Sequence, residues 1–256
     1  MKYSYALGLA AGAAGLMTLG FNTPTPAAPG KPTPVIVELF TSEGCSSCPP
    51  ADAVLSGLIK RPIAGAEVIA LGEHADYWNH GGWADPFSSA KFSGRQSDYS
   101  RTFGKDNVYT PQMIVDGKTQ FVGSDEDQAR QAISAAARAP KANVQLSKSG
   151  PDLLSVRVDH LPASVRSDPA DILLAVAEDG LASSVGGGEN SGRRLVHSAV
   201  VRSLRVLGTT SGGAFIATPT VKQAAGWNRG HLHAVVFVQE HGSRRIVGAA
   251  KIALFG

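Results

Sequence analysis

Two cysteines separated by two residues are the side chains in this sequence best suited to covalent chemistry. Cys45 and Cys48 are the only cysteines among the 256 residues, and Pro49-Pro50 follows them directly. A thiolate attacks a disulfide to form a mixed disulfide, which a neighbouring thiol then resolves, so the two thiols must lie close together. By position, we expect Cys45 to be the exposed attacking thiol and Cys48 the more buried resolving thiol. The spacing favours thiol–disulfide exchange with a protein dithiol or disulfide partner.

The same cysteine pair has two other interpretations. Half of a zinc site would need further ligands, and histidines would have to supply them because no second cysteine pair is present. A local structural disulfide is the other alternative. Since both cysteines lie in one motif, no disulfide can link distant segments of the chain, and this weighs toward chemistry.

The residues on either side of the cysteines predict a strand, a tight loop and a helix. The run Val35–Phe40 is apolar and β-branched except for Glu38, and apolar residues recur at helical spacing over Val54–Ile59. Proline is favoured in the first turn of a helix. The cysteines are therefore expected at a helix N-terminus, where unpaired N–H groups and the helix dipole stabilise a thiolate.

Composition is that of an ordinary folded protein. Hydrophobic residues make up 43% and charged residues 18% of the chain, which does not indicate disorder. The net charge of +3 is too small, and its lysines and arginines too scattered, to indicate a nucleic-acid partner.

The N-terminus has the pattern of an export signal. Lys2 precedes the uncharged run Ala6–Phe21, and small residues and prolines follow. We interpret residues 1–28 as a signal peptide, cleaved near Ala27 or Ala28, and residues 29–34 as a linker. The mature protein is expected in the periplasm or outside the cell. The apolar run is shorter than the ~20 residues of a comfortable membrane span, so no stable span is expected after cleavage.

The order of predicted elements divides the chain in two. Residues 35–139 read as strand–helix–strand–helix–strand–strand–helix, which resembles the thioredoxin arrangement. From Pro140 onward, short β-branched runs alternate with glycine-rich turns. We therefore predict an α/β thioredoxin-like domain over 35–139, followed by an all-β, sandwich-like domain over 140–256. The expected strands of the second domain are Val144–Leu146, Leu153–Val158, Ile172–Ala177, Val196–Val206, Phe215–Ala217, Leu232–Val238 and Ile246–Ile252.

The resemblance to thioredoxins implies roles for three further residues. A cis-proline stands beside the thiols in that fold, and Thr110-Pro111, followed by an apolar strand and an Asp-Gly turn, matches its position. The Thr110 backbone would then pair with an extended substrate segment. A buried acid in the first strand accepts the proton of the resolving thiol, and Glu38 occupies a similar place. A trans proline, and a glutamate at the solvent end of the strand, are the alternatives.

The segment after the second predicted strand carries aromatic and histidine side chains. Trp78 and Trp83 are expected to form a substrate-facing rim. Alternatively, His74 or His80 joins the two cysteines in a copper site, since soft thiolates favour copper(I). A loop held by buried aromatic side chains is the third interpretation.

Several longer motifs resemble one bacterial family. The stretch Leu39–Asp52, LFTSEGCSSCPPAD, resembles the signature of a secreted family with a thioredoxin-like fold, domain of unknown function 1223. Further matches cover nearly the whole mature chain: Asp76–Trp78, Gly82-Trp83, Asp85–Phe87, Val108–Gly117, Glu178–Leu181, Gly188–Asn190 and His197. The family implies export and this fold but no reaction. Ser46-Ser47 between the cysteines is neither Gly-Pro nor Pro-His, so it does not indicate the direction of exchange. We expect an exported thiol–disulfide oxidoreductase, or else a non-catalytic copper-binding protein or an interaction module with the same thiols.

Overall fold

The computed structural model describes Met1 and residues 30–255. Apart from Met1, the predicted signal peptide lies outside the described residues. Among the residues described, no helix combines the length and the apolar character needed to cross a membrane.

Thirteen strands and three α-helices form the described part of the chain. The helices are α1 (Cys48–Lys60), α2 (Ala90–Thr102) and α3 (Glu126–Ala136), and two short 3-10 turns are η1 (Ala163–Arg166) and η2 (Arg229–His231). The strands are β1 (Thr33–Thr41), β2 (Ala66–His74), β3 (Gln112–Val115), β4 (Thr119–Val122), β5 (Asn143–Lys148), β6 (Leu154–Asp159), β7 (Ala170–Glu178), β8 (Leu181–Ser184), β9 (Arg194–His197), β10 (Val200–Thr210), β11 (Phe215–Ala217), β12 (Leu232–Glu240) and β13 (Ile246–Ala253).

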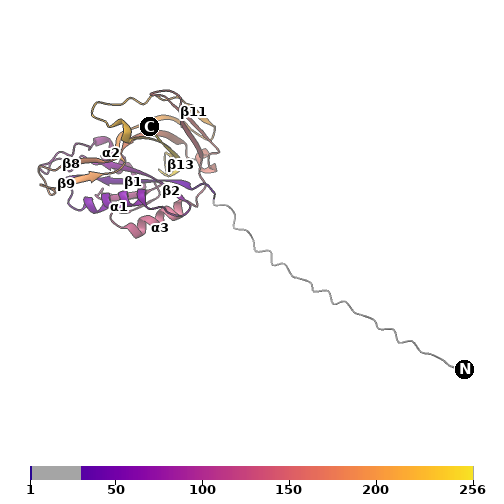
Figure 1. The fold of residues 1–256 in the computed structure, drawn as a ribbon, viewed down its shortest axis with the longest axis horizontal. Helices are drawn as coiled ribbons and strands as arrows, with labels where there is room; N and C mark the ends of the chain where they lie inside the picture. Colours follow the sequence, from indigo (N-terminus) through magenta and orange to yellow (C-terminus); the bar gives the residue numbers. More distant parts are fainter. Residues whose placement is uncertain (2–29, 256) are drawn as a thin grey trace. The chain divides into compact units, whose positions relative to one another are not determined.

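One mixed sheet joins the two halves of the chain, so the predicted division into a thioredoxin-like α/β domain and a separate all-β domain is wrong. Eight strands follow the order β13-β12-β7-β10-β2-β1-β3-β4, and residues from Lys31 onward form one compact unit. Figure 1 shows β1 and β2 at the centre of this unit with helices on either side. The element order over β1 to α3 is as predicted, but its sheet continues directly into strands of the second half.

The junction lies at the outer edge of β2. An unpaired edge there would expose a row of N–H and C=O groups, and β10 covers it. Gly72 of β2 is paired with Val200 of β10, and the Gly72 N–H donates to the Ala199 carbonyl at 2.8 Å. A Cβ atom on Gly72 would lie 3.2 Å from the Ser198 carbonyl oxygen, so glycine permits this close approach. Sequence periodicity alone does not reveal which edge a later strand will join.

Alternation along the strands divides the core between the two faces of the sheet. One face of β1 packs Val37 and Leu39 with α1 and α3, while on the other face Phe40 packs with Tyr99 of α2. A three-stranded sheet, β11-β6-β5, covers the far end of the large sheet on the α1 face. The β3–β4 hairpin is confirmed, with Asp116 and Gly117 at φ 48° and 64°, as a tight hairpin turn requires.

Candidate functional site

Cys45 and Cys48 form a disulfide at the start of α1. Cys48 is the first residue of the helix, after Ser47 at the N-cap position, and Pro49-Pro50 continues the first turn. The predicted exposure of Cys45 is wrong: Cys45 is 1% exposed and Cys48 is fully buried. A segment from the second half of the chain covers them.

The covering segment connects β8 to β9. The Asn190 side-chain amide donates to the carbonyl oxygens of Glu43 and Cys45, each at 2.9 Å. Glu189 accepts a hydrogen bond from the Ser46 N–H at 2.8 Å. A Cβ atom on Gly187 would lie 2.2 Å from the Gly82 carbonyl oxygen, so only glycine allows the cover to lie this close to the loop after β2. The cover is therefore bonded to the residues on both sides of Cys45, Glu43 and Ser46, and to Cys45 itself.

Glu43, two residues before Cys45, is a fully buried carboxylate with three side-chain partners. Trp83 donates its indole N–H to Oε2 at 2.8 Å, the Ser183 hydroxyl donates to Oε1, and His197 Nε2 lies 3.0 Å from Oε1. Burial would raise the pKa of Glu43, but the hydrogen bonds from His197, Ser183 and Trp83 hold this pKa below its usual value. Glu43 is thus ionised at neutral pH and organises side chains from both halves of the chain.

His197 links Glu43 to a second acid, Asp52. His197 Nδ1 lies 3.7 Å from Asp52 Oδ2 and has no hydrogen-bond partner within the described residues. The Asp52 side chain is only 10% exposed, and burial raises its pKa to about 7 against the opposing attraction of His197. Asp52 follows Cys48 by four residues on α1, which places the two side chains on the same face of the helix. A group that titrates near neutral pH therefore stands on the cysteine face of α1.

A second buried acid–imidazole pair adjoins the first. His74 Nδ1 lies 2.7 Å from Asp85 Oδ2, and the His74 and His197 rings meet edge to face with centroids 4.7 Å apart. Asp85 also accepts the Glu43 N–H at 2.8 Å. Burial would raise the pKa of Asp85, but its hydrogen bonds and the charge of His74 lower it. Asp85 thereby fixes both the loop before the cysteines and the His74 ring.

Three of the predicted site residues lie beside the cysteine loop. The Thr110–Pro111 peptide bond is cis, as predicted. A Cβ atom on Gly123 would approach both Ala51 of α1 and Pro111, so Pro111 lies against the start of α1. The Trp78 indole N–H donates to Thr110 Oγ1 at 2.7 Å, and the Trp78 Cβ packs against Gly44.

Trp83 and Glu38 differ in place from the prediction. Trp83 donates into the buried Glu43 cluster and is not part of an open rim. Glu38 lies on the opposite face of β1 from α1, where it accepts from Arg95 Nε at 2.6 Å and from the Tyr99 hydroxyl at 2.5 Å. Since strand residues alternate between faces, the acid predicted to serve the thiols faces α2 instead.

The alternative copper site is not assembled. His74 is committed to Asp85, and His80 lies exposed in the loop that follows. Within the described residues, no group of three or more His, Cys, Asp and Glu side chains is arranged to hold a metal ion.

Sequence reasoning missed five residues of the cluster as site residues: Glu43, Asp52, Asp85, Asn190 and His197. All five lie in stretches that resemble the family pattern, and this was the available signal. A pattern along the chain does not show which acid faces which histidine, because Glu43 and His197 are 154 residues apart.

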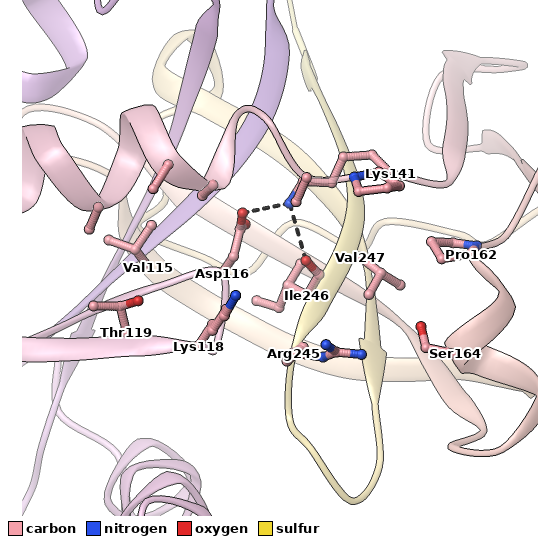
Figure 2. Close-up of a pocket in the computed structure, with 15 residues that line it drawn as sticks. Val115, Asp116, Lys118, Thr119, Lys141, Pro162, Ser164, Arg245, Ile246 and Val247 are labelled. Atoms are coloured by element: carbon pink, nitrogen blue, oxygen red, sulfur yellow. Dashed lines mark hydrogen bonds and ion pairs between the residues drawn. The ribbon is translucent and has the colours of Figure 1, made fainter.

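A separate cavity of about 340 Å³ lies near the start of β1, away from the cysteines (Figure 2). Lys141 Nζ donates to Asp116 Oδ2 at 2.5 Å and to the Ile246 carbonyl at 3.2 Å, and Arg245 pairs with Glu240 at 2.9 Å. The positive charge of Lys141 in this cavity is thus already neutralised by Asp116, where the two halves of the chain meet.

Comparisons with known proteins match most of the described unit. The family described as "Protein of unknown function (DUF1223)" matches residues 36–239. Protein AGR_C_4864 from Agrobacterium tumefaciens is 26% identical with a TM-score of 0.72, covering 87% of this chain and 95% of that one. HBP35 of Porphyromonas gingivalis is 15% identical with a TM-score of 0.60, covering 87% and 75%, and shows likeness of fold alone. No curated protein matches the chain.

Proposed function

We propose a reaction for this chain, which belongs to the DUF1223 family of proteins of unknown function: reversible thiol–disulfide exchange between the Cys45–Cys48 pair and a protein dithiol or disulfide. One observation carries the proposal. The disulfide opens a helix and adjoins a buried cluster in which a carboxyl group titrates near neutral pH. A structural disulfide has no need of such a group, whereas exchange consumes and releases protons.

The exchange balances as two displacements at sulfur. A partner thiolate attacks Cys45 Sγ, the Cys45–Cys48 bond breaks, and Cys48 leaves as a thiolate that takes up a proton. Asp52 lies on the same face of α1, its pKa is raised to about 7, and its protonated form is the donor in this step. A second partner thiolate then attacks the partner sulfur of the mixed disulfide, which forms the partner disulfide and releases Cys45. In the reverse direction Asp52 accepts the proton of Cys48.

The cover must open for a protein partner to reach Cys45. The two Asn190 bonds and the Glu189–Ser46 bond are the contacts that such an opening breaks. We place the reaction in an exported compartment, because the N-terminal run has the pattern of a signal peptide and disulfides persist outside the cytosol.

Capture of the mixed disulfide tests the proposal. In the variant Cys48→Ser, Cys45 attacks a partner disulfide but nothing resolves the product, so a covalent complex sensitive to reductant is expected in the exported fraction. The variant Cys45→Ser, which keeps the other cysteine, serves as the control. The purified parent protein should also cycle between dithiol and disulfide in glutathione buffers. A protein that captures no partner and shows no such cycle is not an exchange protein.

A further inference from the structure

A second cleft, of about 420 Å³, lies between the start of α2, the start of β10 and the loop that carries Trp227. Its walls combine aromatic rings, cationic groups and serine hydroxyls, and no Asp or Glu lines it. The lining residues used below are Phe87, Phe92, Lys91, Arg202, Arg205 and Trp227.

Two of the three cations of this cleft, Lys91 and Arg205, are held by neutral groups. Lys91 Nζ donates to the Leu204 carbonyl at 3.1 Å, and Arg205 Nη2 donates to the Thr220 carbonyl at 2.8 Å. Backbone carbonyls fix the position of a cation but do not cancel its charge. The positive charge of both side chains is therefore available to a ligand.

An irregularity in the sheet sets the direction of the Arg202 side chain. Val201 and Ser203 are paired with consecutive residues of β7, so Arg202 is the extra residue of a β-bulge. A bulge redirects a side chain from the regular alternation of the strand. The Arg202 guanidinium carbon lies 5.6 Å from the ring centroids of both Phe87 and Trp227. The guanidinium is thus fixed between two aromatic faces on the wall of the cleft.

One carboxylate, that of Glu178, lies beside the cleft. Glu178 Oε2 lies 3.5 Å from Arg202 Nε, and Glu178 Oε1 accepts from the Asn228 N–H at 2.8 Å. Among the described residues, neither Nη group of Arg202 donates a hydrogen bond. With Glu178 counted against Lys91, Arg202 and Arg205, the cleft keeps an excess of two positive charges.

We propose that this cleft is a binding site for a small aromatic acid, a planar ring carrying one carboxylate. The carboxylate would bind to the Nη groups of Arg202 and to Arg205 or Lys91, because a guanidinium matches the two oxygens of a carboxylate. The ring would pack against Phe92 and Trp227, where offset stacking adds to apolar burial. The volume falls within the range of small-molecule sites, ~300–1,000 Å³.

The site is separate from the disulfide chemistry but adjoins its support. The Phe87 ring contacts the rings of His74 and His197 at centroid distances of 5.5 and 5.7 Å. One wall of the cleft is therefore the outer side of the buried acid–imidazole cluster. The cavity of Figure 2 carries no comparable proposal, because its buried cation is paired with a carboxylate.

Calorimetric titration of the oxidised full-length mature protein with 2-naphthoate tests the site. We expect one molecule to bind per chain. We expect the neutral 2-naphthalenemethanol, which lacks the carboxylate, and acetate, which lacks the aromatic ring, each to bind at least about tenfold more weakly. The variant Arg205→Gln changes an exposed side chain and should weaken naphthoate binding about tenfold.

The matched control is Arg157→Gln, which removes an arginine that pairs with Asp159 on β6 and should leave binding unchanged. Arg202→Gln is the second variant, with near-ultraviolet circular dichroism as the check on its fold. Absence of naphthoate binding at millimolar concentration overturns the proposal, as does equal binding of the neutral analogue or full affinity in both cleft variants.

Discussion

The substitution Asp52→Asn should change how the stability of this protein depends on pH. The folded pKa of Asp52, about 7, stands about three pH units above the ordinary value of 3.8. Between these values the unfolded chain releases the proton while the folded chain keeps it, so the contribution of Asp52 to stability is full below pH 3.8 and is lost as pH rises to about 7. At ~1.4 kcal/mol per pH unit, the loss amounts to about 4 kcal/mol.

Asparagine carries no ionisable proton, so the variant escapes this loss. Urea unfolding of the oxidised proteins at pH 4 to 8 measures this effect. The quantity compared is the difference in free energy of unfolding between the variant and the parent at each pH. That difference should grow by about 4 kcal/mol in favour of the variant over this range, while titrating groups distant from Asp52 cancel because both proteins share them. Glu43→Gln is the control of opposite sign, because the pKa of Glu43 is lowered and its stabilisation is present above its usual value. If the free energy of unfolding depended on pH in the same way for Asp52→Asn and for the parent, the raised pKa of Asp52 would be refuted.

Two further substitutions test the cover and the buried acid on the opposite face. Asn190→Ala removes two hydrogen bonds to the cysteine loop and should speed reduction of the disulfide by dithiothreitol about tenfold, with Asn143→Ala as the exposed control; an unchanged rate would mean that the cover does not limit access. Arg95→Met leaves the Glu38 carboxylate buried without its cation and should lower the free energy of unfolding by ~3–5 kcal/mol. The reduction potential of the disulfide should not change in this variant. A changed potential would mean that Glu38 influences the disulfide after all.

Local patterns were sufficient to predict the elements around the cysteines. The β-branched run before Thr41, the prolines after Cys48 and the Asp116-Gly117 turn each specify a conformation through their own backbone preferences, and the structure has β1, α1 and the β3–β4 hairpin there. The expected strands of the second half also fall within observed strands, except that Leu153 precedes β6 and that 196–206 divides into β9 and β10. These features depend on neighbours in the sequence.

What sequence reasoning missed depends on contacts between distant segments. Glu38 interrupts an apolar strand, and its burial was foreseen as one possibility, but its face is set by Arg95 and Tyr99 of a helix that begins 52 residues later. Exposure of Cys45 was expected from its place before a helix, yet the cover comes from Asn190. Periodicity along one strand carries no information about which later segment will lie over it.

The error about the domains and the omission of the buried cluster have one physical cause. The β10 strand pairs with β2 at Gly72, and this pairing brings the residues just before it, Ser198 and His197, against Gly72 and Glu43 respectively. Two independent domains would leave Glu43 without His197 and Ser183, as a buried carboxylate with only one of its three side-chain partners, at a cost of several kcal/mol. The continuous sheet therefore does more than close an edge. It is what allows an ionised Glu43 to be buried next to the disulfide, and it makes the chemistry of the first half depend on the second.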